Sequence, residues 1–133
     1  MRRFHLEIAT PDGKCFDGEA ESILLRTDDG DIEILAGHAD FLASLSTGRA
    51  RIITEAGEKF ASVCGGFVSV SNSNVKVAAI TFEFAENIDL SRAKQAKERA
   101  EAVLSSANDE KQILLAKAKL ARALSRINVA ELK

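Results

Sequence analysis

The sequence has no tryptophan and no tyrosine, and it has one proline and two cysteines among its 133 residues. Because its seven phenylalanines are the only aromatic side chains of the Phe, Tyr and Trp type, the core must be mainly aliphatic and the surface offers few platforms for stacking bases. Cys15 and Cys64 are far apart and form no Cys-x-x-Cys pair, so we expect two structural thiols in a reducing compartment. These absences argue against single-stranded nucleic acid binding and against a disulfide framework.

Glycine and proline are missing from the second half of the chain. No glycine or proline follows Gly66, whereas the first 66 residues contain all eight glycines and Pro11. A segment without these residues, rich in Ala, Lys, Glu and Arg from Leu90 onward, can form long helices because no position in it requires a special backbone angle. No run approaches membrane-spanning length, and no apolar run follows Met1 as in a signal peptide, so we expect a soluble chain.

The first part of the chain alternates in the pattern of β-strands. Phe4, Leu6 and Ile8 share one face until Pro11-Asp12-Gly13 provides a turn. Turn residues, including Gly65-Gly66, separate nearly all of the further strand-like runs, which are 22–26, 31–35, 41–45, 49–54, 59–64, 67–71 and 75–82. This regular spacing predicts an all-β sandwich or barrel.

After Glu86 the period becomes helical. Asn87 or Asp89 can cap a first helix, in which Leu90, Ala93, Lys97, Ala100 and Leu104 repeat at helical spacing. Capping residues at 105–109 interrupt the pattern, which predicts two antiparallel helices joined by a short loop.

The second helix is expected to have a packing stripe and an opposite basic row. The stripe consists of Ile113, Ala116, Lys117, Leu120, Leu124 and Ile127. The row, which we expect to face outward, consists of Lys119, Arg122, Arg126 and Lys133. Because two short helices with small apolar faces are marginally stable alone, the hairpin should dock on the β part or on another molecule.

Charge changes at the same place as the period. Residues 1–86 contain 8 Lys and Arg against 14 Asp and Glu, and residues 87–133 contain 10 against 6, giving net charges of −6 and +4. A basic hairpin can fold back on an acidic body, or it can reach an acidic partner or a phosphate-rich ligand, and the charges do not choose between these.

No arrangement of residues indicates catalysis or a resident metal. We find no nucleophile elbow and no glycine-rich phosphate loop, and the carboxylates between Asp28 and Glu33 lack the ligand spacing of a calcium loop. His5 and His38 have no second ligand at zinc spacing. We therefore expect no catalytic residues, no metal site and no obligatory cofactor.

Four arginines of the helical part form pairs on two helix faces. Arg92 and Arg99 share a face of the first helix, and Arg122 and Arg126 share a face of the second. Forked guanidinium donors suit phosphate oxygens, so the four could hold a nucleoside triphosphate. Solvated helices carry arginine routinely, and spacing alone favours that plainer interpretation.

Three sequence segments resemble one family. The run GDIEILAGHADFLASL at 30–45, the run GGFVSV at 65–70 and Asn74-Val75 are similar to the epsilon subunit of bacterial F-type ATP synthase, although Ala36 and Asp40 stand where that family often has proline. The likeness spans essentially the whole chain. It implies a ten-stranded β-sandwich over residues 1–86 and an antiparallel two-helix hairpin over residues 87–133.

The resemblance also implies a role. Epsilon subunits are non-catalytic parts of the rotor's central stalk, and they join the gamma subunit to the membrane ring of c subunits during proton-driven ATP synthesis at the cytoplasmic face of the bacterial membrane, to which they are peripheral. Their extended hairpin reaches the beta subunits and inhibits ATP hydrolysis. By this likeness the residues that contact the c-ring and gamma are Gly30, Glu33, Gly37, His38 and Ala39.

The start of the helical part resembles a nucleotide motif of some epsilon subunits. The sequence Ile-Asp-Leu-Ser-Arg-Ala at 88–93 matches I/L-D-x-x-R-A, whose bound ATP stabilises the compact hairpin as a regulatory ligand. The implied ATP-binding residues are Glu83, Ile88, Asp89, Arg92, Ala93, Arg99, Arg122 and Arg126. The alternative, supported only by the charge split, is a generic β-sandwich adaptor whose basic hairpin binds nucleic acid or an acidic protein.

Overall fold

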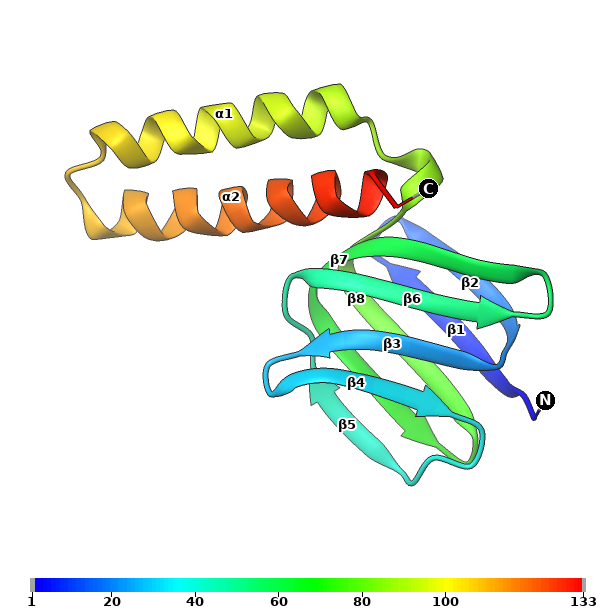
Figure 1. Ribbon diagram of the computed structural model, residues 1–133. Helices are drawn as coiled ribbons and strands as arrows, with labels where there is room; N and C mark the ends of the chain where they lie inside the picture. The colour runs from blue at the N-terminus through cyan, green and yellow to red at the C-terminus, as the bar shows by residue number, and fades with distance from the viewer. Residues whose placement is uncertain (1, 133) are drawn as a thin grey trace.

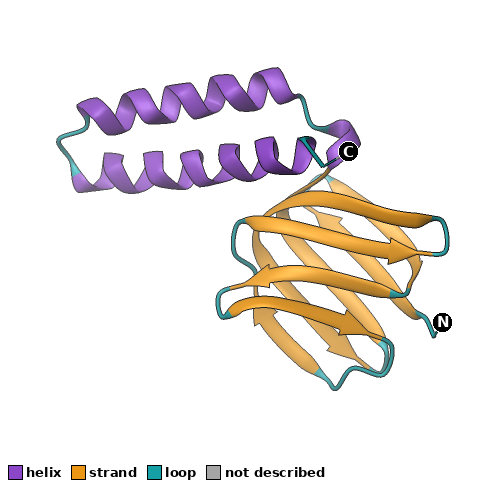
Figure 2. Cartoon of the chain, viewed as in Figure 1, coloured by secondary structure: helices purple, strands orange, loops and turns teal. Residues whose placement is uncertain are grey.

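The computed structural model describes residues 2–132 and consists of a sheet-based domain followed by two helices (Figures 1 and 2). The strands are β1 (Phe4–Thr10), β2 (Gly13–Ala20), β3 (Ser22–Thr27), β4 (Gly30–Leu35), β5 (Phe41–Ser44), β6 (Gly48–Thr54), β7 (Gly57–Ser71) and β8 (Asn74–Phe84). A 3-10 turn, η1 (Ala85–Asn87), leads into α1 (Leu90–Ser106) and α2 (Glu110–Ala130). The expected order of a β-sandwich and then a helical hairpin is confirmed.

The strands form one continuous sheet that folds over on itself. Its order is β2-β1-β8-β7-β6-β3-β4, with β5 paired to β7, and the pairing is antiparallel except between β1 and β8. The fold-over occurs at β7, which pairs with β6 before its middle and with β5 after it. Strands β6, β3 and β4 therefore form one layer over β1, β8 and β5 (Figure 1).

The expected turn at Gly65-Gly66 is wrong. Both glycines have positive φ, at 69° and 101°, but they bend one strand instead of ending it. A Cβ on Gly66 would lie 1.9 Å from the carbonyl oxygen of Ala78, so only glycine allows β8 to pass this closely. The runs 59–64 and 67–71 are consequently halves of β7.

The strand count is eight within the described residues, not the ten that the resemblance implies. One reason is that β7, with 15 residues, contributes to both layers while counting once. The sequence patterns also missed β2, because Gly13–Ala20 contains two glycines and little alternation. Strand β2 lies at the sheet edge and pairs only with β1, so few of its side chains need to be apolar.

The sandwich core is aliphatic, as expected from the composition. Its largest side chains, each under 2% exposed, are Leu6, Ile8, Ile23, Leu25, Ile34, Ile52, Val68, Val75 and Val77. Phe4 and Phe82 are also buried in this core. Both cysteines are free and half-buried. These side chains come from every layer-forming strand except the short β5 and the edge strand β2.

Aspartates cap both helices of the hairpin. The Asp89 carboxylate accepts the backbone N–H of Arg92 at 3.1 Å, and the Asp109 carboxylate accepts that of Lys111 at 3.0 Å. Each bond satisfies a donor that the first helical turn leaves unpaired. The helices lie antiparallel, as Figure 1 shows, and bury four alanines between them: Ala93, Ala100, Ala116 and Ala123.

The hairpin docks on one end of the sandwich, which is one of the two options that the sequence left open. Helix α2 lies nearer the strands than α1 does (Figure 1). A small cluster of Ala85, Ile88, Val129 and Ala130 joins η1 to the end of α2, with Phe60 packed against it. The hydroxyls of Ser62 and Ser125 add a hydrogen bond of 2.9 Å.

Candidate functional site

A groove of about 730 Å³ runs along the seam between the two helices. Alanines from both helices form its floor, with Ala100 from α1 and Ala116 and Ala123 from α2, all buried. Four cationic side chains line it: Arg99, Lys119, Arg122 and Arg126. No aspartate or glutamate lies among its lining residues.

The basic row of α2 lines this groove; Lys119 and Arg122 are exposed, as expected, whereas Arg126 is half-buried. Helix α2 packs on α1 through Ala116 and Ala123, and Lys119 and Arg126 follow each of these by three residues. Lys133, the fourth member of the expected row, lies outside the described residues.

The expected packing stripe is right for buried Ala116 and for half-buried Ile113, Leu120 and Ile127, and wrong for the other two residues. Leu124 is 39% exposed and Lys117 is exposed, whereas Ala123 is 2% exposed. Small side chains therefore make the helix contact, and the larger leucines flank it. Ranking residues by hydrophobicity placed Leu124 on the packing face, whereas the buried residue is its neighbour Ala123.

Arg126 is held at the end of the groove nearest the sandwich. Its Nη2 donates a hydrogen bond to Oε2 of Glu83 at 3.2 Å, and its Nε lies 2.9 Å from Oε1 of the same carboxylate. Glu83 belongs to β8, so this ion pair connects the sandwich to the hairpin. Because the two side chains are only 35% and 20% exposed, the guanidinium has a defined orientation.

The other three cations of the groove have no such partner. Within residues 2–132, no ion pair involves Arg99, Lys119 or Arg122. Like charges gathered in one hollow raise its positive potential, and clefts lined by one sign of charge attract the opposite ion. The groove is therefore suited to an anion with several charges.

The expected ATP-binding residues divide into two sets. Arg99, Arg122 and Arg126 line the groove, and Glu83 joins them through Arg126. Ile88, Asp89 and Ala93 instead build the start of α1: Ile88 packs under the end of α2, Asp89 caps the helix, and Ala93 is buried in the seam.

Arg92 stands apart from the groove. It precedes Arg99 by seven residues, which is a rise of about 10.5 Å along a helix, and its side chain is exposed. The structure therefore brings three of the four arginines together. It also adds Lys119, which neither the arginine spacing nor the resemblance indicated, although its membership of the basic row was visible in the sequence.

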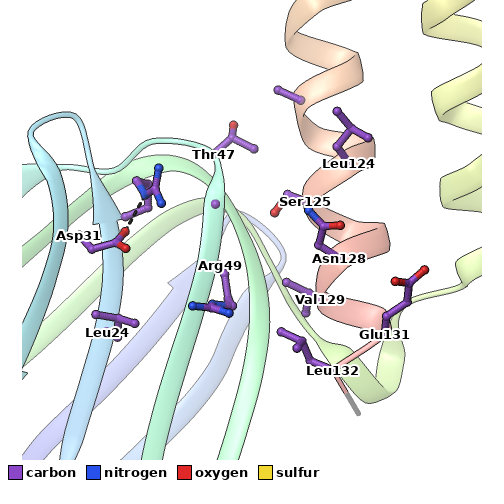
Figure 3. A pocket seen from close by; sticks show the side chains of 13 residues that line it. Leu24, Asp31, Thr47, Arg49, Leu124, Ser125, Asn128, Val129, Glu131 and Leu132 are labelled. Atoms are coloured by element: carbon purple, nitrogen blue, oxygen red, sulfur yellow. Dashed lines mark hydrogen bonds and ion pairs between the residues drawn. The ribbon is translucent and has the colours of Figure 1, made fainter.

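A second groove, of about 700 Å³, lies between α2 and the strands (Figure 3). Leu124, Ser125 and Asn128 line it from α2, and the Ser125 side chain points toward the strands. Its charged side chains include Arg26, whose Nε lies 2.6 Å from Oδ1 of Asp31. Arg49 and Glu131 also line it, so two positive and two negative side chains balance and the groove has no net charge to favour an ion.

The residues expected to contact partner subunits are not all neighbours. Gly37, His38 and Ala39 form the loop between β4 and β5, at the end of the sandwich away from the hairpin (Figure 1). The His38 ring packs edge-on against Phe41 at 5.6 Å between centroids. Gly30 lies at the other end of β4, and Glu33, in the middle, accepts from Nη2 of Arg51 at 2.6 Å.

One outer face of the sheet exposes large apolar side chains. Leu42 on β5, Phe67 on β7 and Ile80 on β8 are 70%, 52% and 63% exposed. They belong to paired strands, with Ser44 opposite Phe67 and Phe67 opposite Ala78. We call Leu42, Phe67 and Ile80 the apolar patch.

Residues 2–132 contain neither a cluster of metal ligands nor a membrane-spanning helix. No group of three or more His, Cys, Asp and Glu side chains lies close enough to hold a metal ion. None of the helices has both the length and the apolar character needed to cross a membrane.

Models of two protein families match consecutive parts of the chain. The beta-sandwich domain of the ATP synthase delta/epsilon chain matches residues 3–85, and the long alpha-helix domain of the same chain matches residues 86–131. The fold and these two matches define a two-domain chain of the ATP synthase delta/epsilon class.

Similarity to individual proteins identifies the family within this class. The ATP synthase epsilon chain of Ruminiclostridium cellulolyticum is 38% identical over 128 residues, covering 96% of both chains, and that of Bacillus pumilus is 37% identical over 98% of both chains. The chain belongs to the family of ATP synthase epsilon chains. Its fold is also similar to a chain in the cryo-EM structure of the Euglena gracilis mitochondrial ATP synthase, with a TM-score of 0.83 and 24% identity over 98% of this chain and 82% of that one.

Proposed function

We propose that the protein is a non-catalytic subunit of the ATP synthase central stalk, at the cytoplasmic face of the bacterial membrane. In this role the sandwich joins the gamma subunit to the c-ring during proton-driven ATP synthesis. Membership of the epsilon chain family supports the proposal most strongly.

Two surfaces of the sandwich support contact with other subunits. The apolar patch places three large exposed side chains on neighbouring strands, a feature typical of protein interaction sites. We assign the patch to gamma. The loop of Gly37, His38 and Ala39 lies at the end of the sandwich away from the hairpin, and we assign it to the c-ring.

For the hairpin we propose regulation by ATP. The observation that carries this proposal is the groove in which Arg99, Lys119 and Arg122 lie together without carboxylate partners. Both helices line it, so a ligand bound there favours the folded hairpin over one whose helices have separated. An extended hairpin would reach the beta subunits and inhibit hydrolysis, and ATP would relieve inhibition by shifting the population toward the compact form.

The proposed site binds ATP without hydrolysing it. Guanidinium and ammonium groups can neutralise phosphate oxygens. Phosphoryl transfer additionally needs a group that positions the attacking water and groups that hold a metal on the phosphates. The groove lining contains no carboxylate that could hold a metal on the phosphates or accept a proton from water.

Calorimetry with ATP tests the regulatory proposal. We expect Arg122→Ala to weaken ATP binding about tenfold, because it removes a charge-assisted contact while leaving the Arg126–Glu83 pair intact. Arg126→Ala should weaken it further, since it also frees Glu83. The control Arg3→Ala, which changes an exposed arginine of the sandwich, should bind as the wild type does. Absence of heat at millimolar ATP would remove the proposal.

Association with gamma tests the stalk proposal. Phe67→Asp, in the centre of the apolar patch, should weaken binding of the full chain to a gamma-containing catalytic complex by at least about tenfold. The control Val103→Asp changes an exposed valine of α1 and should not weaken it. The stalk proposal is refuted if the wild-type chain neither associates nor changes ATPase activity, with or without residues 88–133.

A further inference from the structure

We propose that Lys119 contacts the terminal phosphate of the nucleotide and makes the groove selective for a triphosphate over a diphosphate. This inference deepens the proposed ATP regulation and rests on it for the identity of the ligand. Lys119 is not among the residues that the nucleotide motif implies.

The first argument is the order of charges along the groove. Helix α2 runs away from the hairpin turn toward the sandwich, so Arg126 lies nearest the sandwich, Arg122 follows about 6 Å further out, and Lys119 about 4.5 Å beyond that. Lys119 is thus the outermost cation that α2 contributes to the groove.

The second argument is the chemistry of the groups at the two ends of the groove. Near the sandwich, the carboxylates of Glu83 and Asp89 and the backbone of η1 can accept hydrogen bonds, as suits the base and ribose of a nucleotide. These carboxylates would repel phosphate. Toward the hairpin turn the lining is cationic and then neutral, ending at Ser106 and Gln112. The phosphate chain should therefore extend outward, toward Lys119.

The third argument is the position of Arg99. In an antiparallel pair closed by a turn near residues 107–109, Arg99 on α1 faces the part of α2 that contains Lys119. Both side chains line the groove and neither makes an ion pair within residues 2–132. An alternative partner for Lys119, a carboxylate one turn away on α2, is absent because positions 115, 116, 122 and 123 are Leu, Ala, Arg and Ala.

The order of the cations along the groove decides how many phosphates a ligand needs to reach Lys119. Because Lys119 lies about 10.5 Å from Arg126 along α2, the last phosphate of a diphosphate that starts at Arg126 should lie nearer Arg122 than Lys119. A triphosphate reaches Lys119, whose exposed ammonium group then adds a contact that only the longer chain makes. Loss of Lys119 should reduce affinity for the triphosphate and spare the diphosphate.

Calorimetry on the full chain with ATP, ADP and inorganic tripolyphosphate tests this inference. We expect Lys119→Gln to raise the Kd for ATP and for tripolyphosphate about five- to tenfold, and that for ADP less than about twofold. The matched control is Lys117→Gln, two residues away and also exposed but outside the groove lining, and it should change none of the three.

The outcomes separate the inference from the proposed function. Equal losses for ATP and ADP in Lys119→Gln, or no loss for either, overturn the role of Lys119 while leaving ATP regulation in place. If the wild-type chain binds tripolyphosphate through Lys119 but binds no ATP, the groove is a polyphosphate site and the proposed ATP regulation fails. If tripolyphosphate does not bind the wild type, the inference fails whatever ATP does.

Discussion

The sandwich and the hairpin are built around side chains of different size. Nine branched aliphatic side chains under 2% exposed fill the sandwich, whereas the seam between the helices consists of four buried alanines. Hydrophobic burial contributes about 0.8 kcal/mol per methylene, so an alanine seam stabilises its helices much less than a core of leucine, isoleucine and valine stabilises strands. One chain thus combines a body with a large aliphatic core and an appendage whose helices bury much smaller side chains against each other.

The difference explains why the hairpin depends on its docking contacts. Val129 and Ala130 at the end of α2 meet Ile88 and Ala85, and within residues 2–132 the side-chain polar contacts of α2 with the sandwich are Ser62–Ser125 and Glu83–Arg126. Segments with few buried apolar contacts open at lower free energy than the global fold. Opening of the hairpin should therefore require less free energy than unfolding of the sandwich.

The largest expected effect is in the sandwich core. Leu6→Ala should lower the free energy of unfolding by about 2–5 kcal/mol, because it leaves a cavity at a fully buried position. Urea denaturation followed by circular dichroism measures the loss. The control Leu42→Ala, at 70% exposure, should cost less than about 0.5 kcal/mol. Similar losses for both would mean that the core is not close-packed.

The next effect should be confined to the hairpin. Val129→Ala removes two methyl groups from the docking cluster and should favour opening by about 2 kcal/mol, roughly a thirtyfold rise in the open population. Hydrogen exchange should then quicken at the amides of α1 and α2 but not at those of β1 and β8. Val103→Ala, at an exposed valine of α1, is the control. Faster exchange throughout the sandwich would show that the two parts unfold together.

A smaller effect is expected at the hydroxyl contact. Ser125→Ala leaves the hydroxyl of Ser62, which is 4% exposed, without its partner, at a cost of about 1 kcal/mol to docking. Adding Ser62→Ala should recover part of that loss, because both polar groups are then gone. Hydrogen exchange of α2 in the two single variants and the double variant gives the coupling energy. Additive losses would contradict a direct contact between the two residues.

The smallest effect should come from an exposed ion cluster of the sandwich. The Lys14 ammonium lies 3.0 Å from Oε1 of Glu7 and 3.1 Å from Oδ2 of Asp17, and hydrogen bonds to Glu7 and then Asp17 raise the pKa of Lys14 above 10.5. A raised lysine pKa stabilises the fold fully below the unfolded value, and this stabilisation is lost as pH rises through the folded value. Lys14→Gln should therefore be slightly less stable than the wild type at neutral pH.

That difference should shrink above pH 10.5, where Lys14 loses its charge in the wild type as well. Urea denaturation at neutral and at alkaline pH measures it. A difference that grows with pH would contradict the assigned cause. High salt should also reduce it, because exposed pairs are screened.

Most of the fold could be predicted because its patterns are local. Alternation at Phe4, Leu6 and Ile8 identified β1, and Asp89 with the interruption at 105–109 placed the ends of the helices. The failures were positions where another segment decides the local structure. Gly65-Gly66 has the residues of a turn, but its pairing with β8 keeps it within a strand.

The candidate site was harder to predict for a related reason. The arginine spacing showed which residues share a helix face, but not which face meets the other helix. That depends on Ala116, which the expected stripe included, and on Ala123, which it omitted because a small side chain carries little weight in a hydrophobic pattern. Once the seam is known, Lys119 falls beside Arg122 and Arg126, so the same sequence row becomes the wall of a groove.

The bend in β7 has a further consequence for how the two ends of the sandwich are joined. Strand β8 runs without a break from Asn74, at the end away from the hairpin, to Phe84, which leads directly into η1. Strand β7 accompanies it over nearly the same length and bends without ending at Gly66. The turn between β7 and β8 is therefore joined to the base of the hairpin by two paired lengths of backbone with no intervening loop.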